Sequence, residues 1–186
     1  MRLLILLLLL ASGFVSAEQT PQWLQALRDG QAVLIMRHAQ APGVGDPERF
    51  RLGDCSTQRN LDQRGREQAV YWGDYLREQG IVSVRLYTSG WCRAQETAEG
   101  LNLGPAQVLD SLNSFFGRPA LADQSIRELR AFVSELGPGA PVIMVSHQVN
   151  ITALTGEFPR SGEALILAVP LGDKVEVLAR VPVPEP

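Results

Sequence analysis

Two short stretches decide how this chain folds: VLIMRH at residues 33–38 and VIMVSH at residues 142–147. In each, four apolar residues are followed by one polar residue and a histidine. Uninterrupted apolar runs of this length are typical of parallel strands whose two faces are both buried. The sequence therefore predicts two interior strands, each of which ends at a histidine.

The segments around these two runs alternate between helical and strand patterns. We expect helices at 21–30, 61–79, 91–101 and 123–136, strands at 32–36, 82–87, 107–109 and 141–145, and a closing hairpin built from 162–169 and 174–181. Asp62 is the expected N-cap of the second helix. This alternation predicts an α/β fold, a three-layer sandwich with a mostly parallel central sheet. No repeat or linker divides the chain, which favours one domain.

The composition excludes several classes of protein. The chain has 186 residues, of which 45% are hydrophobic, and 17 basic residues against 20 acidic ones give a net charge of −3. No basic block stands out, so we expect no nucleic-acid partner. Disordered chains, disulfide-dense miniproteins and multi-span membrane proteins all have different compositions.

The N-terminal segment has the three parts of a secretory signal peptide. Arg2 precedes an apolar run from Leu3 to Ala11, and small residues follow at Val15-Ser16-Ala17. We expect cleavage after Ala17, which leaves residues 18–186 as the mature domain, without a membrane span, in a bacterial periplasm. The alternative is an uncleaved anchor, but the run is well short of the roughly 20 residues that a span needs.

The chain has two cysteines, Cys55 and Cys92. An even pair in an oxidising compartment favours a disulfide. The alternative is two unrelated buried thiols. Neither cysteine belongs to a Cys-x-x-Cys motif, so the sequence gives little support to a redox centre or a zinc site.

The chemistry-bearing residues gather after the strands. His38 and His147 are the only histidines, and each directly follows an apolar run. The carboxyl ends of parallel strands are where α/β sheets bind ligands. Arg37 precedes the first histidine, and Arg93 lies near the start of the expected helix at 91–101. Two arginine forks, two histidines and a helix N-terminus together favour a site for a tetrahedral dianion.

Four segments, taken in order, resemble the histidine phosphatase superfamily, which includes the cofactor-dependent phosphoglycerate mutases. These segments are LIMRHA at 34–39, NLDQRGREQA at 60–69, SGWCRAQETA at 89–98 and VSH at 145–147. The first is similar to the Arg-His-Gly signature of the family. The resemblance implies a phosphoglycerate mutase-like fold in a small exported bacterial member of the family.

The resemblance also implies the catalytic roles. His38 would be the nucleophile that carries the phosphoryl group, and Arg37, Arg93 and His147 would hold the phosphate oxygens. Cations around the phosphoryl oxygens offset the charge of the transition state. We therefore expect a hydrolase that needs no metal and no cofactor.

The sequence departs from the family pattern in four places. Ala39, Gly90 and Gln148 replace the usual Gly, Pro and Gly, and Ser114 stands where many members carry the glutamate that serves as general acid. Serine is a poor proton donor for a leaving alkoxide. Asp110, at the end of a predicted strand, is the preferred substitute. The alternatives are that Asp110 only caps a turn, that Asp123 or Asp54 serves, or that the enzyme supplies no acid.

The long loop at 42–60 is the expected specificity loop. Arg59 and Asn60 are its best candidates for substrate contacts, because they directly precede the family-like helix. Asp46, Arg49 and Arg51 are interpreted instead as salt-bridged residues of a solvated loop.

The leading hypothesis is an exported phosphomonoesterase of the histidine acid phosphatase type. Its substrate would be a small or glycan-linked phosphate, with a sugar phosphate of the lipopolysaccharide core as one example, suggested by analogy with exported relatives. The alternatives are a phosphohistidine phosphatase, a catalytically weak phosphate- or sugar-phosphate-binding protein, and a structural envelope protein. The sequence predicts no oligomeric state.

Overall fold

The computed structural model describes residues 20–184. The expected signal peptide at 1–17 lies outside the described residues. Within 20–184, no helix combines the length and the apolar character that crossing a membrane requires.

The core of the fold is a six-stranded sheet in the order β3-β2-β4-β1-β5-β6. The strands are β1 (Ala32–Arg37), β2 (Arg85–Thr88), β3 (Ala106–Val108), β4 (Val142–Ser146), β5 (Ala164–Ala168) and β6 (Val177–Val181). Strands β3, β2, β4 and β1 run parallel, whereas β5 and β6 are antiparallel to their neighbours. The predicted α/β fold with a mostly parallel sheet is confirmed.

The register of β1 against β4 places the two histidines side by side. Arg37 lies opposite Ser146, so His38 and His147 each follow the last paired residue of neighbouring parallel strands. Their side chains therefore leave the same edge of the sheet, and their ring centroids are 5.3 Å apart.

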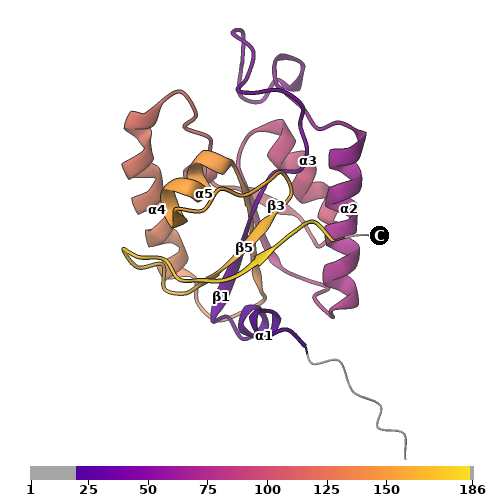
Figure 1. Ribbon diagram of the computed structural model, residues 1–186, viewed down its shortest axis with the longest axis vertical. Helices are drawn as coiled ribbons and strands as arrows, with labels where there is room; N and C mark the ends of the chain where they lie inside the picture. The colour runs from indigo at the N-terminus through magenta and orange to yellow at the C-terminus, as the bar shows by residue number, and fades with distance from the viewer. Residues whose placement is uncertain (1–19, 185–186) are drawn as a thin grey trace, which may run out of the picture.

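Helices cover both faces of the sheet (Figure 1). They are α1 (Gln22–Arg28), α2 (Gln63–Glu78), α3 (Cys92–Leu101), α4 (Ala122–Glu135) and α5 (Gln148–Thr155). Side chains alternate along β1, so Leu34 and Met36 pack with α1, α2 and α3. Val33 and Ile35 face the other way and pack with α4 and α5. The three expected layers are therefore present.

Two elements differ from the sequence prediction. Strand β2 begins at Arg85 rather than residue 82, because it starts where β4 offers a partner at Val142. Val82 lies in a stretch of sequence with a strand-like pattern, but it precedes the strand and is 71% exposed. Helix α5 is missing from the prediction because β-branched residues such as Ile151 and Thr152 have weak helix propensity. It ends at Gly156, which has a left-handed backbone with φ of 80°.

The long segment between β1 and α2 projects beyond the layers at the histidine-bearing edge of the sheet (Figure 1). Its one regular element is the 3-10 helix η1 (Cys55–Thr57). At its far end, the Asp62 side chain accepts a 2.8 Å hydrogen bond from the backbone N–H of Gly65, so the predicted N-cap of α2 is confirmed.

Candidate active site

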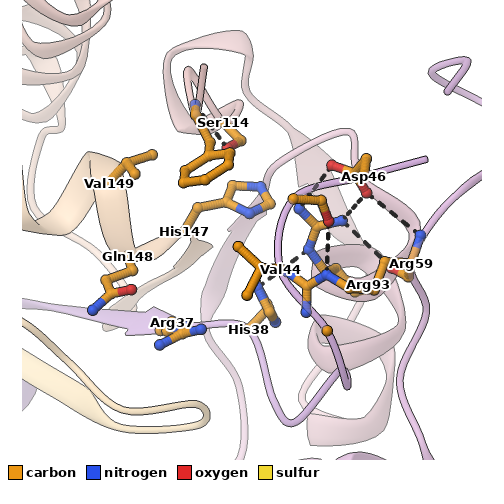
Figure 2. Close-up of a pocket in the computed structure, with 13 residues that line it drawn as sticks. Arg37, His38, Val44, Asp46, Arg59, Arg93, Ser114, His147, Gln148 and Val149 are labelled. Carbon is orange, nitrogen blue, oxygen red and sulfur yellow. Dashed lines mark hydrogen bonds and ion pairs between the residues drawn. The ribbon is translucent and has the colours of Figure 1, made fainter. Parts of the chain in front are cut away.

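A cavity of about 130 Å³ opens at the carboxyl ends of β1 and β4 (Figure 2). The polar part of its lining consists of Arg37, His38, Asp46, Arg59, Arg93, Ser114, His147 and Gln148. The four residues that the sequence singled out for the phosphate site, Arg37, His38, Arg93 and His147, are thus brought together in one pocket.

His38 is held as a neutral imidazole with one nitrogen free to act as a nucleophile. Its Nδ1 lies 2.8 Å from the carbonyl oxygen of Ala39, which can only accept, so Nδ1 carries the proton and Nε2 keeps its lone pair. Burial and the neighbouring Arg93 lower the pKa of His38 to about 3. The side chain therefore stays neutral at physiological pH.

Arg37 presents an unsatisfied donor at the pocket. Its Nη1 donates to the carbonyl oxygen of Pro159 at 3.2 Å, whereas its buried Nε has no hydrogen-bond partner among residues 20–184. A buried N–H group without an acceptor is costly, and an anionic ligand would remove that cost. Arg37 is therefore suited to bind a phosphate oxygen.

Arg93, in the first turn of α3, is 3% exposed and contacts two functional groups at once. Its Nε donates to Nε2 of His38 at 3.2 Å. Its Nη1 and Nη2 donate to the two carboxylate oxygens of Asp46 at 2.6 and 3.2 Å. One edge of the guanidinium group thus faces the nucleophile, while the other is fixed by a bidentate ion pair.

Asp46 is the residue that sequence reasoning misjudged. It is not part of a solvated loop surface: it also accepts from the indole N–H of Trp91 at 2.9 Å and lines the pocket. Burial raises its pKa, but the hydrogen bonds from Arg93 and Trp91 outweigh burial and hold the pKa below its usual range. No local sequence pattern marks this role, because the partners lie some 45 residues away.

Arg59 lines the pocket, but its neighbour Asn60 does not. The Arg59 guanidinium donates to the carbonyl oxygens of Gly45 (2.8 Å) and Ala41. Burial and nearby Arg93 lower its pKa to about 10, so it remains a cation at neutral pH. The Asn60 side chain donates to the carbonyl oxygen of Cys55 at 2.7 Å and lies outside the pocket lining, so its substrate contact stays a prediction.

His147 is oriented by a chain of hydrogen bonds that leads away from the pocket. Its Nε2 lies 2.8 Å from the hydroxyl oxygen of Ser89, and that hydroxyl donates to the side-chain oxygen of Asn113 at 3.2 Å. The Asn113 amide donates in turn to Asp110 at 3.0 Å. The Ser89 oxygen can therefore accept from Nε2–H of His147. In the neutral ring Nδ1 then carries a lone pair, and it can donate to a phosphate oxygen only when the ring is protonated. Burial, with His38 and Arg93 nearby, lowers the pKa of His147 well below its ordinary value.

Asp110, the general acid preferred from the sequence, does not line the pocket. It begins the 3-10 helix η2 (Asp110–Leu112), and it lines a neighbouring groove rather than the pocket. A general acid needs hydrogen-bond reach to the leaving oxygen. The structure therefore places Asp110 outside the pocket, and its role as proton donor stays a prediction. Within the described chain, Asp46 is the one carboxylate that lines the pocket.

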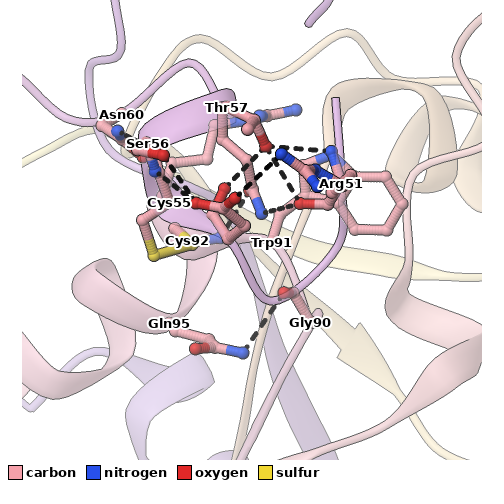
Figure 3. The surroundings of a disulfide bond; sticks show 12 residues. Arg51, Cys55, Ser56, Thr57, Asn60, Gly90, Trp91, Cys92 and Gln95 are labelled. Atoms are coloured by element: carbon pink, nitrogen blue, oxygen red, sulfur yellow. Dashed lines mark hydrogen bonds and ion pairs between the residues drawn. A yellow bond between two sulfur atoms is a disulfide. The ribbon is translucent and has the colours of Figure 1, made fainter. Parts of the chain in front are cut away.

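A disulfide joins Cys55 in η1 to Cys92 at the start of α3, with 5.7 Å between their Cα atoms (Figure 3). The backbone N–H of Cys92 also donates to the side-chain oxygen of Gln58 at 3.0 Å. Trp91 and Arg93, which flank Cys92, both bind Asp46. The long loop is thus tied to α3 on both sides of the arginine that faces the nucleophile.

Residues 33–118 match the family described as the histidine phosphatase superfamily (branch 1). The matched segment includes Arg37, His38, Arg59 and Arg93 of the pocket. The match covers somewhat less than half of the chain, and over this segment the chain is similar to the histidine phosphatase superfamily.

A curated protein and two solved structures are similar to parts of this chain or to its fold. The mitochondrial serine/threonine-protein phosphatase Pgam5 of Drosophila grimshawi is 36% identical over 67 residues, which cover 36% of this chain and 20% of that protein. The chain thus aligns with only about a fifth of this relative. The fold is similar to that of the protein histidine phosphatase SixA complexed with tungstate, with a TM-score of 0.56, 20% identity, and coverage of 81% of this chain and 96% of that one.

A second solved structure, a candidate α-ribazole-5′-phosphate phosphatase from Escherichia coli, has the same fold. Its TM-score is 0.59 and its identity 17%, over 82% of this chain and 96% of that one. At these identities the two solved structures show the shared fold alone.

Proposed function

We propose that the protein is a phosphomonoesterase that works through a phosphohistidine intermediate at His38. The observation that carries the proposal is the state of His38: its Nδ1–H is fixed by Ala39, and its unprotonated Nε2 faces the pocket beside Arg93. A neutral imidazole nitrogen in this position can attack phosphorus directly, without prior loss of a proton.

The three arginines of the pocket supply the charge that the reaction needs. Arg37, Arg59 and Arg93 with Asp46 give a net charge of about +2, which matches a phosphomonoester dianion. Positive groups fixed around the phosphoryl oxygens stabilise the transition state electrostatically. The reaction as proposed requires no metal ion, because guanidinium groups take the position that a cation would otherwise fill.

The reaction has two steps. Nε2 of His38 forms a bond to phosphorus while the bond from phosphorus to the leaving oxygen breaks, and the leaving group departs with the electron pair. Water then attacks the phosphohistidine, the P–N bond breaks, and inorganic phosphate and free His38 result. His147, held at Nε2 by Ser89, can donate Nδ1–H to the phosphate in both steps when its ring is protonated, a form that the nearby phosphate dianion favours.

The export of the protein is part of the proposal. The N-terminal sequence pattern supports a cleaved signal peptide and a periplasmic location, and a disulfide between Cys55 and Cys92 fits an oxidising compartment. Small phosphomonoesters, including sugar phosphates of the cell envelope, are the substrates that such a location offers.

A specific observation favours a second candidate, a phosphohistidine phosphatase. The one carboxylate of the described pocket, Asp46, is ion-paired to Arg93 and therefore cannot readily protonate an alkoxide. Imidazole is a good leaving group that makes less demand on an acid. The solved relative SixA is described as a protein histidine phosphatase, which is consistent with this candidate.

The test is a panel of phosphorylated substrates that includes sugar phosphates, aryl phosphates and phosphohistidine, assayed with wild type and His38→Ala in the presence of a chelator. We expect the wild type to release phosphate and to form an acid-labile phosphoenzyme, and the variant to do neither. Undiminished turnover by His38→Ala, or no turnover of any substrate by the wild type, would end the proposal.

A further inference from the structure

The rim of the pocket outside the arginine cradle is apolar. Val44 and Phe116 both line the pocket, and they are 88% and 56% exposed. Val149, in the first turn of α5, adds a third apolar side chain. Single exposed apolar residues are common on protein surfaces. Here two exposed ones, with the partly buried Val149 beside them, come from three separate segments and line one opening.

Phe116 is positioned by the loop across the opening. Gly45 has a φ of 67°, and a Cβ atom built on it would lie 3.4 Å from the Phe116 ring. The ring therefore lies beside the loop tip, at a distance that a methyl group on Gly45 would fill. The N–H of Phe116 donates to the hydroxyl of Ser114 at 3.3 Å, and the preceding Phe115 is buried. The exposed part of the ring is thus held at the mouth of the pocket.

The groups in the pocket that could donate a proton also bear on the choice of substrate. Asp46 is bound through both oxygens by Arg93 and through one oxygen by Trp91, so it is an ionised anchor rather than a proton donor. Ser114, the residue at the position of the family acid, lines the pocket but has no acidic proton to give at neutral pH. A substrate of this pocket should therefore release a leaving group that is stable as an anion.

We propose that the preferred substrate is an aryl phosphate, a phosphate ester of a phenolic oxygen, whose ring lies against Phe116 and Val44. This inference rests on the proposed phosphatase function and names its substrate class. Phenolate leaves with the electron pair of the broken P–O bond and takes its proton from water afterwards. Aromatic rings in contact with one another gain about 0.5–1.5 kcal/mol beyond buried area, which corresponds to roughly 2- to 10-fold in affinity.

The experiment uses four small phosphates that separate ring binding from leaving-group quality. Phenyl phosphate has a ring and a good leaving group, benzyl phosphate a ring and a poor one, acetyl phosphate a good leaving group without a ring, and glycerol phosphate neither. For the wild type we expect kcat/KM to be highest for phenyl phosphate. Both ring-bearing compounds should have lower KM values than their partners without a ring.

The decisive variants are Phe116→Ser and Val44→Ser, with Phe158→Ser as the matched control. Phe158 is 65% exposed and does not line the pocket. Phe116→Ser should raise KM for phenyl and benzyl phosphate by roughly 2- to 10-fold more than it raises KM for acetyl and glycerol phosphate. Val44→Ser should act in the same direction, and Phe158→Ser should change none of the four values.

The outcomes distinguish a failure of the aryl-phosphate inference from a failure of the proposed phosphatase function. Equal effects of Phe116→Ser on all four compounds, or a wild type that prefers glycerol phosphate, would overturn the aryl-phosphate inference while the phosphatase function stands. Turnover of sugar phosphates alone would have the same consequence. If no phosphate ester is hydrolysed at all, both proposals fail.

Discussion

At the scale of single residues, the behaviour of the two histidines follows from what their ring nitrogens contact. His38 gives its Nδ1–H to Ala39, and His147 has its Nε2 at Ser89. Each ring therefore has one nitrogen held by a neighbouring oxygen. The other nitrogen of His38 accepts from Arg93 in the pocket. The roles proposed for the two rings, nucleophile for His38 and phosphate-binding group for His147, therefore depend on different neighbouring residues.

Ser89 is the positioning residue for His147, and its removal should impair turnover. Ser89→Ala deletes the oxygen that lies 2.8 Å from Nε2 and so releases the tautomer and the ring orientation. A hydrogen bond to a charged group contributes about 1.5–3 kcal/mol, which predicts a fall in kcat of roughly 10- to 100-fold. The pH–rate profile should shift as well, because His147 loses its hydrogen-bond partner.

The matched control for this prediction is Ser111→Ala. Ser111 is also buried, but its hydroxyl has no hydrogen-bond partner among the described residues. The Ser111→Ala substitution should leave kcat and the pH–rate profile close to those of wild type. An unchanged profile in Ser89→Ala would show that Ser89 does not orient His147.

Asp46 should matter through Arg93. An amide in its place offers one accepting oxygen, whereas the carboxylate now accepts from Arg93 and Trp91 through both oxygens. Asp46→Asn should therefore lower kcat/KM by about 10- to 100-fold, the range for a lost charged hydrogen bond. Asp54→Asn is the control in the same loop, because the Asp54 side chain contacts only Ser56 and Arg51 of that loop and lies at the protein surface. Steady-state kinetics of the two variants would settle the point, since equal values would contradict it.

The site residues that could be predicted from the sequence differ from those that could not in how far along the chain their contact partners lie. Arg37, His38 and His147 were predictable because strand and histidine are adjacent in the sequence, and Arg93 because it begins a helix. Asp46 and Ser89 act through partners 47 and 58 residues away. Contacts of that range arise from the folded chain and leave no periodic signal in it.

At the scale of elements, the segments with strong apolar patterns were predictable and those with weak ones were not. Strands β1 and β4 are buried on both faces and read as continuous apolar runs. Helix α5, only eight residues long, follows His147 without a strong apolar stripe, yet Gln148 and Val149 from its first turn line the pocket. The helix forms because it packs against β1 and α4, with Ile151 and Leu154 in the core.

The disulfide links two elements that both contribute to the pocket, so its reduction should affect stability and activity together. In a chain-entropy account, a cross-link of this kind stabilises a fold by roughly 2–4 kcal/mol. Reductant should lower the melting temperature of wild type and reduce kcat/KM, because the loop that carries Asp46 and Arg59 loses its tie to α3.

The double variant Cys55→Ser/Cys92→Ser provides the control for reduction. It should resemble reduced wild type and should not respond to reductant. Two free thiols in the denatured, unreduced wild-type protein would show that the bond is absent in the isolated protein, and an unaltered melting temperature after reduction would contradict its structural role.

At the scale of the whole molecule, the sheet order explains why one edge collects the chemistry. Strands β2, β4 and β1 end side by side, and the segments that follow them supply Ser89, His147 and His38. The antiparallel strand β5 closes the other side of β1 and contributes no side chain to the pocket. Charge is therefore concentrated on one edge, where two neutral histidines are buried among arginines.

That concentration makes the stability of the fold depend on pH. Burial lowers the pKa of His38 to about 3 and the pKa of His147 well below its ordinary value, so both stay neutral in the fold. In the unfolded chain both protonate near pH 6.5. Below that pH the unfolded state binds more protons, so stability is fully present above pH 6.5 and falls as the pH is lowered. For each histidine, the free energy of unfolding should fall by about 1 kcal/mol for every pH unit below 6.5.

Two carboxylates extend the effect at lower pH. Hydrogen bonds from Arg180 lower the pKa of Glu163, and those from Arg93 and Trp91 outweigh burial to lower that of Asp46. Their contribution is present above the ordinary carboxyl pKa, near 4, and is lost as pH falls through the lowered values. The histidine effect should therefore appear first, between pH 6.5 and about 4.5, where the carboxylates are still ionised in both states.

Thermal unfolding at several pH values would test this, because the chain has only two histidines. The melting temperature of wild type should be nearly constant above pH 7 and should fall steadily from pH 6.5 to 4.5. In His38→Asn/His147→Asn the slope in that interval should flatten, whatever the absolute stability of the variant. Equal slopes in the two proteins would mean that the histidines are not buried in their neutral form, and that the pocket does not hold its nucleophile as we describe.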